Sequence, residues 1–340
     1  MQVSTIGLDI AKNVFQVHGV DTDERVAMQR RLRRREVLPF FAKLPPTLIG
    51  IEACGSAHYW ARELSALGHE VRLMPPAYVT PYRKRNKTDA RDAEAICEAV
   101  RRPNMRFVPI KTVEQQAARG LHRVRDLLVR QCTQIANAVR GLSAEFGLVT
   151  REGRDGLGQL FAAIESQPAP IPEPLCSALI GLARQWEALN ARIRELDERI
   201  VRESRAHPTA CRLMEVPGIG PITAHALVAG VADPGVFASA RDFAAWLGLT
   251  PRENSSANKR VSGAISRAGD GTLRRLLVLG AASLVRQSRA RPQRTGPWLL
   301  GLLARRPVKV AIVAQAAKSA RIAWALMATG EHYRAKPAAA

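Results

Sequence analysis

The chain has 340 residues, 46% of them hydrophobic, and a formal net charge of +21. This length suits two or three domains, and the hydrophobic content excludes a mainly disordered chain. The excess of positive charge favours a polyanionic partner, nucleic acid ahead of an anionic membrane, over a basic surface that is merely hydrated.

The five cysteines are dispersed, with no Cys-x-x-Cys pair. This distribution argues against a structural zinc site and a disulfide framework, and it is typical of a reducing cytoplasm. The N-terminal segment reaches Asp9 too early for a signal peptide. The most apolar late segment, residues 308–330, carries Lys309, Lys318 and Arg321, which argues against a membrane span.

The first hundred residues alternate between strand and helix patterns, which indicates an α/β layer. Two β-rich runs separated by a short turn predict a hairpin, and the basic segment QRRLRRRE (29–36) follows it. The predicted strands are 3–10, 14–20, 47–53 and 70–76, and the predicted helices are 56–69 and 89–102.

The middle of the chain is helical. Residues 112–146 form a long polar helix pattern, and a proline-rich hinge at 167–174 separates it from a second helix over 175–206. Apolar side chains recur in this second helix every three or four residues, as in a coiled-coil or helical-hairpin seam, although an ordinary bundle helix has the same spacing. Both interpretations make it an arm and a candidate self-association surface. The seam residues are Leu182, Trp186, Leu189, Ile193, Leu196 and Ile200.

The segment VPGIG (216–220) lies between two helical patterns. It resembles a helix-hairpin-helix turn, in which Gly218 and Gly220 would allow close approach and the second helix would offer N–H groups to a phosphate. A plain αα-hairpin turn fits the residues equally well. Further helices are predicted from about Thr272 and over about 308–329, before a disordered tail at 334–340.

Four carboxylates stand where they could converge. Asp9 and Glu52 each end an apolar strand, and Asp89 and Asp92 lie one turn apart on one helical face. Taken singly, such acids are more often caps or salt-bridge partners. If the helix packs over both strand ends, however, the cluster needs cations to stay ionised. Its oxygen donors suit Mg²⁺ or Mn²⁺, and two such ions bind the attacking and leaving oxygens of a phosphodiester.

Two basic runs, Arg30–Arg35 and Arg83–Lys87, are candidate phosphate contacts, with a hydrated surface as the alternative. We favour binding for the second run because it adjoins the acids. Its cations are Arg83, Lys84, Arg85 and Lys87.

Four motifs in this order resemble the DEDD insertion-sequence transposases of the IS-one-ten family, relatives of the Piv and MooV DNA invertases. They are GLDIAK (7–12), IEACGSAHYWARELSALGHEVRLMPP (51–76), KTDARDAEAI (87–96) and the region from PGIG to TLRRLL (217–277). The resemblance covers nearly the whole chain. It implies an α/β plus all-α protein with a RuvC-like (RNase H-like) domain at 1–110, a coiled-coil arm at 111–206 and a mostly helical C-terminal transposase domain at 207–333.

The resemblance also implies site residues. The acidic tetrad falls on Asp9, Glu52, Asp89 and Asp92. An essential serine falls on Ser256 within PRENSSANKR (251–260), with Ser255 as the alternative. Ala257 stands where the family usually has Gly, and Asp270 where Asn is common. Nearby cations could neutralise a phosphate, namely Lys259, Arg260 and Arg267.

The family further implies a composite site, in which the acids of one subunit act beside the serine of another in a dimer or tetramer. It implies donor and target DNA, a guide-type non-coding RNA from the element itself, and a bacterial cytoplasm, at the nucleoid. The expected function is a DNA recombinase that cuts and rejoins strands. The alternatives are a RuvC-type structure-specific endonuclease and a non-catalytic nucleic-acid-binding relative.

Overall fold

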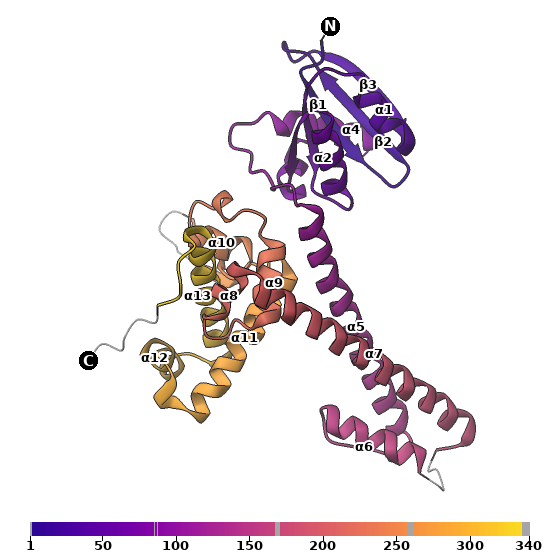
Figure 1. The fold of residues 1–340 in the computed structure, drawn as a ribbon, viewed down its shortest axis with the longest axis vertical. Coiled ribbons are helices and arrows are strands. Elements are labelled where there is room, and N and C mark those ends of the chain that lie inside the picture. The colour runs from indigo at the N-terminus through magenta and orange to yellow at the C-terminus, as the bar shows by residue number, and fades with distance from the viewer. Residues whose placement is uncertain (1, 85, 87, 167–170, 257–260, 335–340) are drawn as a thin grey trace. The chain divides into compact units, whose positions relative to one another are not determined.

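The computed structural model describes residues 2–84, 86, 88–166, 171–256 and 261–334 (Figure 1). Part of the predicted tail, 335–340, lies outside these residues. The chain divides into two compact units, Met1–Val113 and Glu114–Ala340. The first contains a mixed sheet and the second is mainly helical.

The sheet of the first unit has five strands in the order β3-β2-β1-β4-β5. β1 pairs antiparallel with β2, and β2 with β3, whereas β1, β4 and β5 run parallel. The predicted hairpin and the two later strands are therefore confirmed, and the mixed sheet is consistent with an RNase H-like domain. The strands are β1 Thr5–Ile10, β2 Val14–Val20, β3 Val26–Arg33, β4 Leu48–Glu52 and β5 Glu70–Met74.

The third strand was not predicted from the sequence. β3 covers most of the basic segment after the hairpin and occupies an edge of the sheet. Only Leu32 in it is buried, and Arg30 interrupts the alternation of Val26, Met28 and Leu32 by which a half-buried strand would be recognised. The short helix η1 (Arg34–Glu36) follows directly.

The two faces of this sheet differ in chemistry. One face carries the large apolar side chains of β1, β2 and β4, and it packs with α1 (Val37–Phe41) and α2 (Ala57–Ala66). Phe15 meets Trp60 edge-to-face there, with ring centroids 4.9 Å apart. The opposite face is covered by α4 (Asp89–Val100), which follows α3 (Pro76–Val79) and η2 (Thr80–Tyr82).

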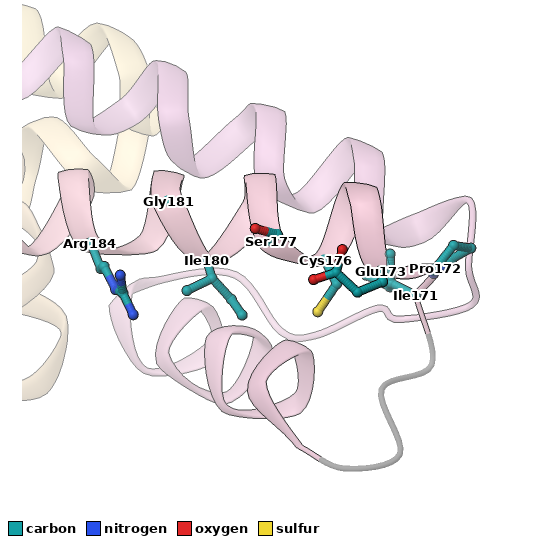
Figure 2. Close-up of a pocket in the computed structure, with 8 residues that line it drawn as sticks. All are labelled: Ile171, Pro172, Glu173, Cys176, Ser177, Ile180, Gly181 and Arg184. Carbon is teal, nitrogen blue, oxygen red and sulfur yellow. The ribbon is translucent and has the colours of Figure 1, made fainter.

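The second unit begins with α5 (Val113–Ala144), α6 (Arg154–Glu165) and α7 (Glu173–Ala206). The end of α5 packs with α6 and the first half of α7 in one apolar core. The seam residues Leu182, Trp186 and Leu189 lie half-buried against this core within one chain. A coiled-coil arm therefore stays a prediction. Figure 2 shows a hollow beside the first turns of α7, lined by residues that include Cys176, Ile180 and Arg184.

The rest of the second unit surrounds another apolar core, formed chiefly by α8, α9, α10, α11 and α13. α13 is long and apolar enough to cross a membrane, but it contributes Ala316, Ala320 and Ala323 to this core. The segment 251–265 contains a short hairpin that the sequence analysis did not predict. The elements are α8 Pro208–Met214, α9 Pro221–Gly230, η3 Pro234–Val236, α10 Ala240–Trp246, β6 Pro251–Glu253, β7 Ser262–Ile265, α11 Gly271–Ala290, η4 Pro292–Arg294, α12 Pro297–Arg305 and α13 Val308–Thr329.

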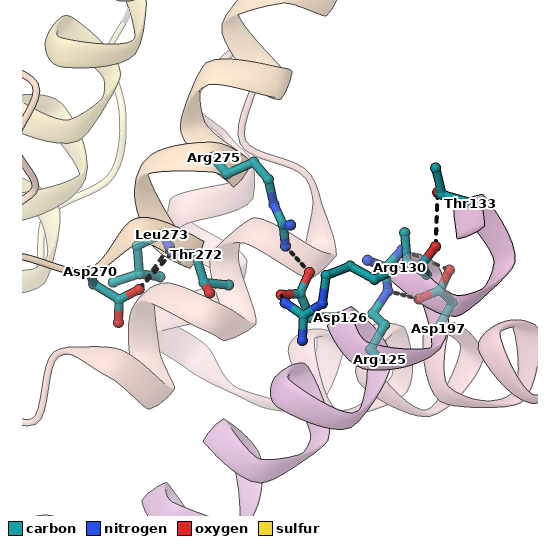
Figure 3. A network of polar contacts seen from close by, with 10 residues as sticks. Arg125, Asp126, Arg130, Thr133, Asp197, Asp270, Thr272, Leu273 and Arg275 are labelled. Atoms are coloured by element: carbon teal, nitrogen blue, oxygen red, sulfur yellow. Dashed lines mark hydrogen bonds and ion pairs between the residues drawn. The ribbon is translucent and has the colours of Figure 1, made fainter. Parts of the chain in front are cut away.

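The first half of α5 is attached to this unit by polar contacts. Among the described residues, neither apolar core of the unit includes an α5 residue before Ile135. Instead, charged side chains of α5 pair with α7 and α11 (Figure 3). The pairs are Arg125 with Asp197, Asp126 with Arg275, and Arg119 with Asp270.

A buried histidine pair completes this attachment. Nε2 of His122 on α5 lies 2.8 Å from Nδ1 of His225 on α9, whose Nε2 lies 3.0 Å from a carboxylate oxygen of Glu203 on α7. Burial, and then the nearby His225 and Arg125, lower the pKa of His122 to about 4. His122 is therefore neutral near pH 7 in the folded protein.

The buried His122 should make stability fall on acidification. Its folded pKa is depressed below the ordinary value of 6.5, so between pH 6.5 and about 4 the unfolded chain binds more protons and unfolding becomes easier. From pH 7 to pH 5 we expect the wild type to lose about 2 kcal/mol more unfolding free energy than His122→Gln. Urea titrations at both pH values measure this difference, with exposed His207→Gln as control. Equal losses in wild type and His122→Gln would contradict the assignment.

Candidate active site

Two of the predicted carboxylates lie at adjacent strand ends. β1 and β4 are parallel, and Leu8 pairs with Ile51, so the next residues, Asp9 near the end of β1 and Glu52 at the end of β4, lie side by side. Both side chains are half-buried. Residues two apart in a strand share a face, so Asp9 lies on the face of Gly7, and Glu52 on that of Gly50.

The other two carboxylates come from α4, which begins beside these strand ends. The side chain of Thr88 caps the helix by accepting from the backbone N–H of Arg91, at 3.4 Å. Asp89 and Asp92 occupy the first turn, where the helix dipole favours negative charge. Farther along, Cys97 of α4 lies against Thr5, with Sγ 3.7 Å from its carbonyl oxygen, so α4 runs antiparallel to β1.

Glycines allow α4 to approach the sheet this closely. A Cβ on Gly7 would lie 2.1 Å from the carbonyl oxygen of Ala93 and 2.4 Å from the backbone nitrogen of Cys97. A Cβ on Gly50 would lie 2.7 Å from Cβ of Val100. Because the two glycines are two residues before Asp9 and Glu52, the same contact that brings α4 onto the sheet brings its first turn to the strand ends.

Three of the four carboxylates meet. One oxygen each of Asp9, Asp89 and Asp92 lies within 4.8 Å of the others. Among the residues that the structure describes, this close group leaves out Glu52. At 4.8 Å, two full charges repel by about 3.5 kcal/mol at an effective dielectric constant of 20, so a nearby cation would stabilise the cluster substantially.

Glu52 nevertheless lies near Asp9, because the charges of both carboxylates affect the same thiol, that of Cys54. Burial raises the pKa of the Cys54 thiol, and the negative charges of Glu52 and Asp9 raise it further. Both carboxylates are therefore close enough to Cys54 to affect its ionisation. Glu52 belongs to the acidic region without belonging to the close trio.

Cations adjoin the acids. Arg83 Nη1 lies 3.4 Å from Asp92, and Lys84 Nζ lies 2.8 Å from Glu94, which lowers the pKa of the Glu94 carboxyl. Arg83 thus lies beside one of the four predicted acids, whereas Lys84 pairs with Glu94, which is not among them. Its other two members, Arg85 and Lys87, lie outside the described residues.

The predicted serine lies in the second unit. Ser256 is exposed and follows β6, in the segment that leads to β7. The neighbouring Ser255 hydroxyl lies 3.3 Å from a carboxylate oxygen of Glu253 and accepts from the backbone N–H of Val261 at 3.3 Å. Arg267 is exposed with a positive φ of 57°. Ala257, Lys259 and Arg260 lie outside the described residues.

Asp270, one of the two departures noted in the family resemblance, has a structural role here. Its carboxylate caps α11 by accepting from the backbone N–H groups of Thr272 and Leu273, at 2.9 and 3.1 Å (Figure 3). It also pairs with Arg119 at 2.8 Å. An asparagine could keep the cap but would lose the charge that pairs with α5.

The VPGIG segment forms the turn between α8 and α9. Gly218 has a φ of 87°, and a Cβ there would lie 2.7 Å from Leu284 and 3.1 Å from the carbonyl oxygen of Gly280 on α11. Packing against α11 therefore accounts for this glycine. Gly220 precedes the first residue of α9 and has open space around it. Phosphate binding by either glycine stays a prediction.

Sequence reasoning missed the neighbours that β2 provides. In the register of the hairpin, Gln16 lies opposite Asp9 and His18 opposite Gly7. No local pattern around Gln16 or His18 signals this position, because it depends on which strand pairs with β1 and in what register.

Comparisons with known proteins identify relatives over the whole length. A family model described as "Transposase IS116/IS110/IS902 family" matches residues 210–295, and a model of DEDD transposases matches residues 6–145. A "Probable family 20 transposase" of Pseudomonas aeruginosa is 50% identical over 98% of this chain and 99% of that protein. The transposase for insertion sequence element IS1328 of Yersinia enterocolitica is 38% identical, over 96% and 98%. The transposase for IS1111A of Coxiella burnetii is 37% identical, over 98% and 92%.

The contact at Gly7 should limit what this position tolerates. Gly7→Ala would force α4 off β1, because the new methyl group overlaps backbone atoms of the helix. We expect a loss of about 1–3 kcal/mol in unfolding free energy, measured by urea denaturation. Gly55→Ala is the matched control, since Gly55 is exposed in the same unit with nothing within 4 Å of its Cβ position. Equal stability of Gly7→Ala and Gly55→Ala would refute the close-packing argument.

Proposed function

The chain belongs to the IS116/IS110/IS902 transposase family and is an insertion-sequence transposase acting on DNA. We propose that it cuts and rejoins DNA strands with a metal-bound acidic site and a serine nucleophile. The observation that supports this most directly is the convergence of Asp9, Asp89 and Asp92 from separate segments of the chain. Acids that only keep a protein in solution have no reason to face one another within 4.8 Å.

The acidic site would hold Mg²⁺ or Mn²⁺. Carboxylate oxygens are the donors these ions prefer, and Glu52, on the neighbouring strand end, completes the tetrad. When bound, such ions stabilise charge on the oxygens that exchange at phosphorus. The protein contributes the placement: Gly7 and Gly50 bring α4 to the sheet, and Arg83 neutralises part of the charge at Asp92.

The serine would supply the covalent step. The Ser256 hydroxyl oxygen attacks a DNA phosphorus, the bond from phosphorus to one sugar oxygen breaks, and that oxygen takes up the proton which the serine loses. The strand is then held as a phosphoserine ester until a second sugar hydroxyl displaces the serine. The exposure of Ser256 supports this role, because a DNA phosphate can reach it. Ser255 is the alternative nucleophile.

The remaining parts of the proposal follow from the family resemblance. The acids of one subunit act beside the serine of another, which requires a dimer or tetramer. A guide-type RNA selects donor and target DNA, and the protein works in the bacterial cytoplasm, at the nucleoid. The charge of +21 supports nucleic-acid binding in general.

Metal binding should depend on the trio. Asp9→Asn removes a charged donor, so we expect Mn²⁺ affinity to fall more than tenfold in isothermal titration calorimetry, about 1.4 kcal/mol or more. The matched control is Asp23→Asn, on an exposed acid in the turn between β2 and β3. An unchanged Mn²⁺ affinity in Asp9→Asn would rule out the proposed metal site.

The serine separates recombination from simple hydrolysis. We expect Ser256→Ala to abolish both strand exchange and the covalent protein–DNA adduct on a denaturing gel, because no other group at that position can form the ester. Ser255→Ala should retain both. Suppose that Ser256→Ala still cleaved DNA, and that neither the wild type nor the variant formed a covalent adduct. The RuvC-type endonuclease would then replace the recombinase. Loss of the adduct in Ser255→Ala alone would assign the nucleophile to Ser255.

A further inference from the structure

The arginines of the edge strand β3 are divided between the two faces of the sheet. Asp9 lies opposite Gln16, and Gln16 lies opposite Arg31. Directly opposite residues in antiparallel strands project to the same face. The side chains of Asp9, Gln16 and Arg31 therefore form one row across the sheet, running from acidic through neutral to basic.

Independent contacts establish that this is the face covered by α4. The neighbouring row on the same face is two residues away along each strand. It consists of Gly7, His18 and Gln29, and Gly7 packs against α4. Nε2 of Gln29 lies 3.5 Å from Nδ1 of His18. Burial lowers the pKa of His18, and the charges of Glu94 and Lys84 act on it as well. The row that contains Arg31 thus lies on the same side as the acidic trio.

The alternate residues of β3 lie on the other face. Arg30 is opposite Val17, and Leu32 is opposite Phe15; both partners belong to the apolar core beneath α1 and α2. Arg34, just after the strand, lies over the Trp60 ring at 5.0 Å on that side. Arg31 and Arg33, two residues apart, share the acidic face. The basic run is therefore not one continuous patch.

Arg31 is available for a ligand. It is exposed, and no carboxylate in the described parts of the chain forms an ion pair with it, whereas Arg72 and Arg101 in the same unit pair with Glu70 and Glu24. Two strand spacings separate the backbones of Arg31 and Asp9, about 10 Å. At this separation, about one Debye length, Arg31 does not neutralise the acids but can bind a phosphate of a strand that they hold.

We infer that Arg31, with Arg33 beside it, binds the phosphate backbone of the DNA strand that enters the acidic site, while Arg30 on the opposite face does not. The inference rests on the proposed function, because it takes the acidic trio as the place of cleavage. A separation of about 10 Å corresponds to about three nucleotides at 3.4 Å of rise each. Because the arginine side chain adds to this reach, the contacted phosphate lies a few nucleotides from the one that is cut.

Arg31→Gln and Arg30→Gln test this inference as a matched pair. Both remove one exposed arginine from the same strand, and their melting temperatures report whether the sheet is intact. Binding of a fluorescein-labelled DNA duplex is measured by anisotropy over a range of salt concentrations in EDTA. For Arg31→Gln we expect several-fold weaker binding and a slope of log affinity against log salt that is smaller by about 0.9, one phosphate contact. For Arg30→Gln we expect wild-type values.

Methylphosphonate substitution, which removes the charge of one phosphate at a time, locates the contact. The wild type should lose affinity when the contacted phosphate is neutral, and Arg31→Gln should lose nothing further at that position. An RNA duplex of the same sequence is the second arm. Equal effects of the two substitutions, or an Arg31→Gln effect on RNA alone, would overturn the inference. If Asp9→Asn kept its Mn²⁺ affinity while the two arginines still differed, the proposed function would fail and the DNA contact would stand.

Discussion

The arrangement of the first unit depends on a single close contact, between β1 and α4 at Gly7. A hydrogen in place of a methyl group lets the helix backbone lie directly on the strand, because a Cβ would come within 2.1 Å of a carbonyl oxygen. Gly50 does the same on the neighbouring strand. The contact determines how far the first turn of α4 stands from the strand ends, and hence whether Asp89 and Asp92 reach Asp9. Any side chain at Gly7 would push α4 away from β1, and would thereby separate the carboxylates without contacting them.

Successive side chains of a strand point to opposite faces of the sheet, so the residues on either side of Gly7 have different surroundings. Ile6 and Leu8 are directed to the core beneath α2, whereas Gly7 and Asp9 are directed to α4. Both faces pack apolar side chains, one against α1 and α2 and the other against α4, and the acids lie on the α4 face at the strand ends. The same alternation extends to β3, where Arg31 accompanies the acids and Arg30 the core. One structural period of two residues therefore determines which side chains face α1 and α2 and which lie on the side of the acids.

In the second unit, the two halves of α5 are held by different kinds of contact. Burial of apolar side chains holds the end of α5, but ion pairs and a histidine pair hold its first half. Partly exposed pairs of this kind contribute little individually, about 1 kcal/mol or less, and respond to salt and pH as apolar contacts do not. Asp270 takes part in this network and also caps α11, just after the hairpin segment that carries Ser256. The attachment of α5 and the N-terminal cap of α11 thus share one carboxylate.

The sequence by itself determined the local elements and the candidate chemistry. Periodicity and end signals located the first hairpin, β4, β5 and α4, since these depend on neighbouring residues. The resemblance of four ordered motifs identified the family. β3 was missed, because it is mostly exposed and Arg30 interrupts the apolar alternation of Met28 and Leu32. Which carboxylates meet, the exclusion of Glu52 from the close trio, and the face on which each arginine lies were decided only by the tertiary structure. These features depend on strand register and on the distance between a helix and a sheet, which are set by contacts between residues far apart in the chain.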